Sequence, residues 1–296
     1  MDDIISATVG ICAYNEEKNI ENAVRSVFCQ DADGISIEEV VVVCSGCTDG
    51  TDDTVRLLCG EYPTLRLIVQ EKREGKNSAM NCMLDARKGT DVVVMLNADN
   101  VLSSKTSLSV LLRPFRDPKV GIAGGHPIPV NGTDTVAGYA SNLIWSMHHY
   151  ISLSSPKIGE LIAFRDIGTR LSPGSQSDED TLKMGLEERG YVSVYTPDAT
   201  VSNRGPMNVS DFIKQRTRVN IGELYMKKEH RFATPTWDAR NLCSAMLHSA
   251  RDLGHPIRLS AAIALEIYSK LKAYAYVKMD KGDMNMWDQV GTTKKV

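Results

Sequence analysis

The chain has 296 residues, of which 42% are hydrophobic and 24% are charged, and 34 basic against 37 acidic side chains give a formal net charge of -3. This near-neutral balance argues against a protein that coats nucleic acid, which needs a basic excess. The sequence contains no uncharged apolar run of about 18 residues, so we expect no membrane-spanning helix. The start lacks the basic and apolar regions of a signal peptide, and an odd number of scattered cysteines fits a reducing compartment. We therefore expect a cytoplasmic protein with a well-buried core.

Four short apolar runs rich in β-branched residues lie in the first hundred residues. They are residues 7–12, 39–44, 65–70 and 91–96. Such runs are typical of strands buried on both faces of a parallel sheet. Apolar residues recur with helical spacing between these runs, at 17–29, 51–59 and 76–87. The alternation of strands and helices predicts an open α/β sheet, whose ligand binds at the carboxyl ends of the strands.

The pattern after residue 100 is looser but still alternates. We expect helices at 104–115, 135–153 and 179–190, strands at 120–125, 159–166 and 191–195, and a mostly helical segment at 211–279. No internal repeat or obvious linker occurs, so one domain with a helical C-terminal extension is the simplest organisation.

Polar residues follow three of the predicted strands. These loops are residues 13–17, 44–51 and 97–100. Because neighbouring parallel strands end at the same edge of a sheet, the three loops are expected to converge, as a nucleotide site requires. Each loop taken alone has a simpler interpretation as a turn or a helix N-cap.

Four segments in this order and spacing resemble the family 2 glycosyltransferases with the GT-A fold. Their sequences are AYNEE (13–17), VVVCSGCTDGT (41–51), GKNSAMN (75–81) and LNAD (96–99). The resemblance is collinear through about residue 195 and weaker beyond. It implies an α/β fold of the GT-A type, a Rossmann-like mixed sheet with helices on both faces. It also implies inverting transfer of a hexosyl or N-acetylhexosaminyl group from a nucleotide-diphosphate sugar.

The resemblance implies a divalent cation, Mg²⁺ or Mn²⁺, as cofactor. Asp99 occupies the metal-binding end of the family's Asp-x-Asp motif, and a cation there neutralises the departing diphosphate. Asn97 occupies the first position of that motif; an amide carries no charge, so a lower cation affinity is expected. The alternative is that Asp99 only caps the helix that begins near Ser103.

A second departure lies at Cys44 and Ser45, where the family more often has two acidic residues that position the nucleoside. Residues 44–47 also form a C-x-x-C sequence, which permits a redox interpretation. Lys76 follows Gly75 at a predicted helix start, where a cation and free backbone N–H groups can meet phosphate; a solvated lysine is the alternative.

The nucleoside-diphosphate sugar is expected to contact residues from several of these segments. They are Ala13, Tyr14, Glu16, Cys44, Ser45, Lys76, Asn97, Gln215 and Arg218. The last two belong to the sequence QRTRV, which resembles the Gln-x-x-Arg-Trp motif of membrane-associated and processive members, with Val219 in place of tryptophan. Arg218 would pair with the diphosphate. A surface arginine cluster with Lys214 and Arg216 is the alternative.

Transfer to a hydroxyl needs a carboxylate base. In the family an acidic pair stands at a set distance before Gly-Tyr, and this distance places Asp178 and Glu179 on it, in reversed order, with Asp180 in reserve. All three are alternatively helix-capping groups, since acids favour helix N-termini. His126, His148 and His149 are candidates for contact with the acceptor or, less so, the metal; packed histidines are the alternative.

The helical segment 261–277 places apolar residues among Lys270, Lys272 and the following Lys278, with Tyr268 and Tyr276 near the polar boundary. It either lies on a membrane surface, which would suit a lipid-linked acceptor, or packs on the domain as an ordinary amphipathic helix. The expected partners are thus a nucleotide-diphosphate sugar, a glycan or lipid-linked acceptor and a peripheral membrane contact at the inner face of the cell membrane, with no nucleic acid.

We therefore predict a catalytic GT-A domain at residues 1–205 and a helical extension at 206–296 that packs on it. A degenerate nucleotide-sugar-binding or regulatory module is a rival, because Asn97 and Cys44 replace acids. A sugar nucleotidyltransferase is a second rival, but residues 13–18 lack the Gly-rich basic sequence that it needs. A C-x-x-C oxidoreductase is the third.

Overall fold

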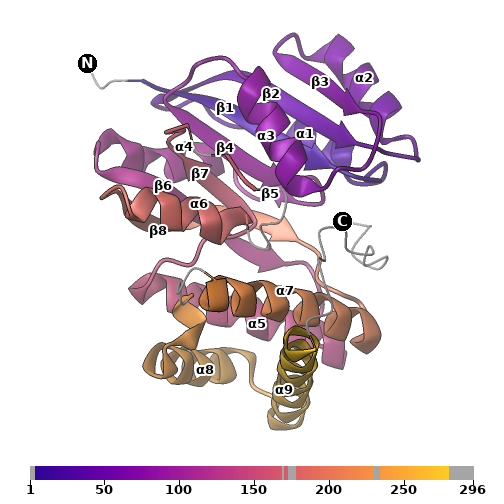
Figure 1. The fold of residues 1–296 in the computed structure, drawn as a ribbon, viewed down its shortest axis with the longest axis vertical. Coiled ribbons are helices and arrows are strands. Elements are labelled where there is room, and N and C mark those ends of the chain that lie inside the picture. Colours follow the sequence, from indigo (N-terminus) through magenta and orange to yellow (C-terminus); the bar gives the residue numbers. More distant parts are fainter. Residues whose placement is uncertain (1–3, 169, 173–177, 230–233, 280–296) are drawn as a thin grey trace.

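A mixed β-sheet runs through the computed structural model of the protein, which describes residues 4–168, 170–172, 178–229 and 234–279. Within these residues eight strands form one sheet, in the order β3-β2-β1-β4-β7-β6-β8-β5 (Figure 1). One half of the sheet is parallel, and the other half contains the antiparallel pairs. The mixed α/β architecture predicted from the sequence is confirmed.

The parallel half alternates strands with helices, as the sequence pattern predicts. It consists of β1 (Ile5–Ala13), α1 (Ile20–Phe28), β2 (Ile35–Ser45), α2 (Thr51–Glu61), β3 (Leu65–Gln70), α3 (Lys76–Ala86) and β4 (Val92–Asn97). Ala13 pairs with Cys44 in β2, and Cys12 pairs with Asn97 in β4. The strands β1, β2 and β4 therefore end at one edge, and the loops that follow them are neighbours.

Strand β2 shows why these apolar runs form a sheet covered on both faces. Val40 and Val42 pack into the core beneath α1, α2 and α4, whereas Val41 and Val43 pack into the core beneath α3 and α6. All four are fully buried. Burial of one such side chain contributes roughly 1.5–3 kcal/mol, so the run is stable only with helices on both sides.

The second half of the sheet departs from the predicted strand ends. Its elements are β5 (Val101–Leu102), α4 (Ser107–Leu112), the short 3-10 helix η1 (Arg113–Arg116), β6 (Val120–Pro129), α5 (Val136–Ser154), β7 (Leu161–Phe164), α6 (Asp178–Glu187) and β8 (Val192–Asn203). Strand β6 continues past the glycines expected to end it. A Cβ at Gly125 would lie 2.7 Å from the Ala199 carbonyl oxygen, so this glycine permits close strand pairing. Strand β8 is also longer than predicted, and β5 was not predicted.

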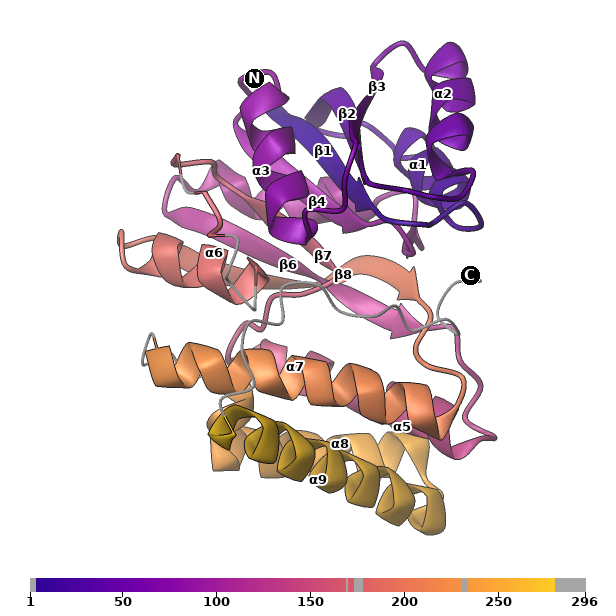
Figure 2. The same ribbon diagram turned by 45° about the vertical axis from the view of Figure 1, so that its right-hand side comes forward.

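The C-terminal helices gather at one end of the molecule (Figure 2). They are α7 (Val209–Glu229), the 3-10 helix η2 (Pro235–Trp237), α8 (Ala239–Leu253) and α9 (Pro256–Lys278). Together with α5 they enclose a third core that includes Tyr139, Phe212, Ala245 and Ala262. The Tyr139 hydroxyl donates to the Gly254 carbonyl oxygen at 2.6 Å. Because α5 lies in the predicted catalytic domain, the helical extension shares a core with it; the division at residue 205 stays a prediction.

Among the described residues, none of the helices is both long and apolar enough to cross a bilayer.

Candidate functional site

The loops after β1 and β2 are tied together at the carboxyl edge of the sheet. The Thr48 N–H donates to Asn15 Oδ1 at 2.7 Å, and the Glu17 N–H donates to Asp49 Oδ2 at 3.2 Å. Asn15 has a φ of 55°, in the left-handed region that asparagine tolerates better than most residues. The convergence of polar loops expected from the sequence is therefore present.

Three of the expected nucleotide contacts lie on the first loop. Ala13 is buried at the end of β1. The Arg73 guanidinium lies over the Tyr14 ring, with its central carbon 4.1 Å from the ring centroid. The buried Glu16 carboxylate accepts from Asn19 Nδ2 at 2.9 Å. Glu16 thus stabilises the turn into α1, while the Tyr14 ring forms part of the edge; their nucleotide contacts stay predictions.

The residues that replace the expected acids at the end of β2 are both buried. Ser45 Oγ accepts from the Glu74 N–H at 3.2 Å, which connects β2 to the segment before α3. The hydrogen bond to Cys47, together with burial, raises the pKa of the Cys44 thiol well above its usual value. The same hydrogen bond lowers the pKa of Cys47. Cys44 therefore belongs to a polar cluster beneath the loop.

Two carboxylates meet where β4 and β7 lie side by side. Asp99 follows β4 and Glu160 precedes β7, whose Leu161 pairs with Leu96. Burial, and next the charge of Glu160, raise the pKa of Asp99 to about 6. Glu160 was not predicted from the sequence, because the antiparallel pairing that brings it to Asp99 leaves no local sequence signal.

Asn97 has a defined partner in this arrangement. Asn97 Nδ2 and Asn100 Nδ2 each donate to Glu160 Oε2 at 2.8 Å. Glu160 has a φ of 58°, a left-handed conformation that is unfavourable for a glutamate and is found disproportionately at functional sites. The first position of the Asp-x-Asp motif is therefore an amide that orients a carboxylate supplied from another strand.

Lys76 connects this carboxylate pair to a second one. Its Nζ lies 2.5 Å from Asp178 Oδ2 and 2.9 Å from Glu179 Oε1. The charge of Lys76 also opposes the rise in the pKa of Asp99, as does that of Arg218. Lys76 begins α3, after Gly75 with a φ of 90°. Lys76 keeps 40% of its side chain exposed while it pairs with both acids, so its contact with phosphate stays a prediction.

The acidic residues of α6 differ in their surroundings. Burial opposes ionisation of Asp178, but the Lys76 charge together with hydrogen bonds from Glu179, Lys76 and the backbone outweighs it and lowers the Asp178 pKa to about 2. Burial and the Asp178 charge raise the pKa of Glu179 to about 8. Asp180 is buried. Near neutral pH the Asp178–Glu179 pair therefore carries one charge and one proton, an arrangement in which the pair titrates as a unit.

The QRTRV segment lies on α7, where its two motif residues line one cavity. Gln215 and Arg218 share this cavity, of about 340 Å³, with Glu160. Arg216 also lines this cavity and pairs there with Glu266 through bonds of 2.8 and 2.9 Å. The alternative of a surface arginine cluster is therefore wrong for Arg216, whose guanidinium is held in an ion pair within the helical region.

The histidines lie on the same side of the sheet. His148 lines the cavity, and neither of its ring nitrogens has a hydrogen-bond partner within the described chain. Burial, and next the Lys157 charge, lower the pKa of His148 to about 3. His126 and His149 stack at 4.4 Å, and His149 Nδ1 lies 2.8 Å from the Tyr195 hydroxyl. The three rings form a neutral aromatic cluster, so acceptor contact stays a prediction.

Comparisons with known proteins agree with this geometry. The family model described as "Glycosyl transferase family 2" matches residues 8–171. Glycosyltransferase AglE of Haloferax volcanii is 29% identical over 92 residues, which span 31% of this chain and 30% of that protein. The matched segment is thus less than a third of that relative's length.

Solved structures resemble the chain over most of its length. A mannosyltransferase of Pyrobaculum calidifontis, solved with GDP-Man and Mn²⁺, has a TM-score of 0.61 at 24% identity and covers 92% of this chain and 78% of its own. S. aureus TarS has a TM-score of 0.52 at 16% identity, covering 94% and 92%. At these identities the likeness shows a shared fold.

Proposed function

The chain belongs to glycosyl transferase family 2 and has the GT-A fold, and from this premise we propose that it transfers a sugar from a nucleotide-diphosphate donor with inversion of configuration. One observation carries the proposal: Lys76 joins the acids of α6 to the carboxylate pair Asp99 and Glu160, with Arg218 on the same side. The site thus combines cations for a diphosphate, oxygen ligands for a metal and a base.

The donor would lie along the carboxyl edge of the sheet. The diphosphate carries negative charge that Lys76 and Arg218 can neutralise, Arg218 through a bidentate contact. The loops that contain Tyr14 and Ser45 would hold the nucleoside. A hexosyl or N-acetylhexosaminyl group would then point toward Asp178 and Glu179 on α6.

The carboxylates fit a hard divalent cation, Mg²⁺ or Mn²⁺. Burial, and next the negative charge of Glu160, raise the pKa of Asp99, and a cation would relieve the repulsion between the two carboxylates. Asp99 and Glu160 would be its protein ligands, with Asn97 orienting Glu160, consistent with the preference of such ions for one or two carboxylates plus phosphate. When bound, the cation would supply charge neutralisation of the diphosphate.

The base would come from the Asp178–Glu179 pair. A carboxylate of the pair accepts the acceptor's hydroxyl proton while the acceptor oxygen bonds to the anomeric carbon and the bond to the diphosphate oxygen breaks. Attack opposite the leaving group inverts the anomeric configuration. Lys76 orients both acids in the free enzyme and is the group that can turn to the diphosphate when the donor binds.

The acceptor that fits the cavity best is a lipid-linked one. The cavity runs from Glu160 and Arg218 into an apolar space lined by Leu143, Met147 and Phe212, among other residues of the helical region. Such a space suits a hydrocarbon chain, and the charged end suits the polar group that carries the reacting oxygen.

The surface beside this cavity supports the same acceptor. Ile267, which lines the cavity, is 53% exposed, and Leu271 and Tyr274 continue the same stripe of α9 with exposures of 64% and 60%. Lys270 also lines the cavity. An apolar stripe beside a lysine is a surface that binds anionic lipid, so a lipid-linked acceptor would reach the cavity from a membrane surface.

The first experiment measures thermal stability with and without Mn²⁺ against UDP, GDP, CDP and dTDP. A ligand that binds only the native state raises the melting temperature, so a Mn²⁺-dependent shift identifies the donor nucleotide. Transfer from the matching sugar nucleotide to a lipid-linked acceptor is then measured. Binding without transfer would favour the degenerate module, and no shift with any nucleotide would contradict the donor site.

A further inference from the structure

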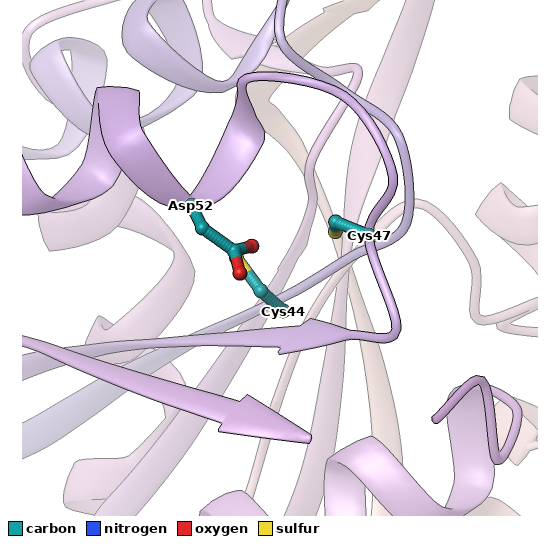
Figure 3. Close-up of side chains that lie close together, drawn as sticks. All are labelled: Cys44, Cys47 and Asp52. Carbon is teal, nitrogen blue, oxygen red and sulfur yellow. The ribbon is translucent and has the colours of Figure 1, made fainter. Parts of the chain in front are cut away.

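Three metal-ligating side chains meet where β2 leads into α2. Figure 3 shows Asp52 extending from the first turn of α2 toward Cys44, with Cys47 on the connecting loop. One ligand atom from each residue lies within 4.8 Å of the other two. Cys44 is fully buried, and Cys47 and Asp52 are partly buried. Neither the proposed cation site nor the proposed base uses this cluster.

Asp52 has a buried oxygen that the protein does not satisfy. Its Oδ1 has no hydrogen-bond partner in the described part of the chain. Cys47 Sγ hydrogen-bonds to Cys44 and donates weakly to the Ala13 carbonyl oxygen at 3.7 Å. A buried carboxylate oxygen without a partner is unfavourable, and a bound cation would remove this penalty.

The backbone holds the two sulfur atoms on the same side of the loop. Gly46 has a φ of 65°, and a Cβ at this position would lie 2.2 Å from the Arg73 backbone nitrogen. The Gly46 N–H donates to the Gln70 carbonyl oxygen at 2.9 Å. Only glycine fits here, so the turn that brings Cys47 back to Cys44 is fixed by the fold before any ligand binds.

We propose that Cys44, Cys47 and Asp52 form a binding site for a thiophilic divalent cation of the Zn²⁺ class. Two thiolates and a carboxylate are ligands that Zn²⁺ prefers, and three protein ligands leave one tetrahedral position for water. The thiols release their protons to solvent when the ion binds. This donor set differs from the all-oxygen set of Asp99 and Glu160, so the two sites select different ions.

The cation would stabilise the loops at the donor edge. It would join the end of β2 to the first turn of α2 and so fix the loop between them. That loop holds the β1 loop through the bond from the Thr48 N–H to Asn15 Oδ1. Zn²⁺ should therefore raise the melting temperature of the protein even without a nucleotide.

The test is a Co²⁺ titration of the reduced full-length chain, after removal of metal by a chelator. Exposed Cys29 and Cys243 are first replaced by serine, so that they do not contribute thiolates. We expect thiolate-to-Co²⁺ charge-transfer absorption that saturates at one Co²⁺ per chain and disappears when Zn²⁺ is added. Absence of this absorption in the reduced protein would overturn the proposal.

Single variants assign the ligands. Cys47→Ser and Asp52→Asn should each weaken Co²⁺ binding at least about 10-fold, and Cys47→Ser should also reduce the charge-transfer intensity. Cys59→Ser, a matched change of a partly buried cysteine on α2, should leave both unchanged. Unchanged absorption in Cys47→Ser would refute the site. Because Asp99→Asn should retain the absorption, failure here is distinguishable from failure of the proposed transfer.

Discussion

The Lys76 ammonium lies 2.5 Å from a carboxylate oxygen of Asp178, a residue far from it in the sequence. It lies 2.9 Å from Glu179 as well. A single cation thus holds both candidate bases and also lies near enough to Asp99 to favour its ionised form. Lys76 therefore contributes to the electrostatics of both acidic pairs.

Lys76→Met should raise the carboxylate pKa values of both acidic pairs, Asp178–Glu179 and Asp99–Glu160. Loss of an adjacent positive charge raises carboxylate pKa values by about 1–3 pH units. The pH at which kcat/KM rises should therefore increase by a similar amount. Transfer should fall at least about 100-fold, because the diphosphate loses a stabilising cation. The check is a pH profile of transfer, with Lys72→Met, an exposed lysine before α3, as control. An unmoved profile would show that Lys76 does not control the acids.

Glu179→Gln tests the base. Burial and the charge of Asp178 raise the pKa of Glu179 to about 8, and a base acts only when deprotonated. The wild-type kcat/KM for a hydroxyl acceptor should therefore increase as the pH rises through about 8. Glu179→Gln should remove this increase and slow transfer about 100- to 10,000-fold while nucleotide binding persists.

The matched control is Glu187→Gln, an exposed glutamate at the other end of α6, which should keep the wild-type profile. If Glu179→Gln keeps the increase near pH 8, the base lies elsewhere, and Asp180 is then the next residue to replace.

The fold was predictable where the pattern is local. The runs in β1, β2 and β4 are apolar on both faces, and this alone indicates a sheet covered by helices. The ends of β6 and β8 were not predictable. In the sequence Gly125 indicates the end of a strand, whereas in the structure it permits close pairing with the Ala199 backbone. Strand β5 is two residues long and forms only by pairing with β8.

The site was predictable where motifs follow strands and less so where it depends on pairing. Asp99, Lys76 and the acids of α6 were predicted from their motifs, and the structure brings Lys76 into contact with Asp178 and Glu179; their roles stay predictions. Glu160 was missed because it reaches Asp99 through the antiparallel pairing of β4 with β7. Asn97 looked like a lost ligand, and only its bond to Glu160 gives it a positioning role.

Asn97→Asp tests the proposed cation site. In the metal-free protein an Asp side chain would face Glu160 Oε2, which now accepts from Asn97 Nδ2 at 2.8 Å, and like charges repel. The variant should melt at a lower temperature than wild type without metal and show a larger upward shift with Mn²⁺. Asn100→Asp places the same charge on the second donor to Glu160 and serves for comparison. Equal Mn²⁺ shifts in wild type and Asn97→Asp would argue against cation binding here.

His148 should make the protein sensitive to acid. Burial and the Lys157 charge, with smaller effects of His126 and His149, lower the pKa of His148 to about 3 from 6.5. The unfolded chain therefore binds more protons between these values, so the free energy of unfolding should fall as the pH drops through this window, by about 1.4 kcal/mol per pH unit.

Chemical unfolding of His148→Phe across that window checks this prediction. The variant cannot be protonated, so its stability should depend less steeply on pH than that of wild type. His255→Asn, a change at an exposed histidine, should leave the slope as it is. A slope that is the same in wild type and His148→Phe would mean that another group governs acid unfolding.

The exposed stripe of α9 should be required for transfer to a lipid-linked acceptor. Leu271→Gln combined with Tyr274→Gln removes two apolar side chains that are 64% and 60% exposed. Since each methylene buried in lipid contributes about 0.8 kcal/mol, binding to anionic vesicles should weaken at least about 10-fold. Transfer to an acceptor held in those vesicles should fall with it, while nucleotide binding in solution stays unchanged.

Ile257→Gln provides the matched control, because Ile257 is 85% exposed in the first turn of the same helix but does not appear among the cavity residues. It should bind vesicles like wild type if the stripe beside the cavity is what contacts lipid. An equal loss of vesicle binding in both variants would indicate a general effect of a more polar surface. No loss in either would favour the other interpretation of this helix, as an amphipathic element that packs on the domain, and the acceptor would then enter from the polar edge of the sheet.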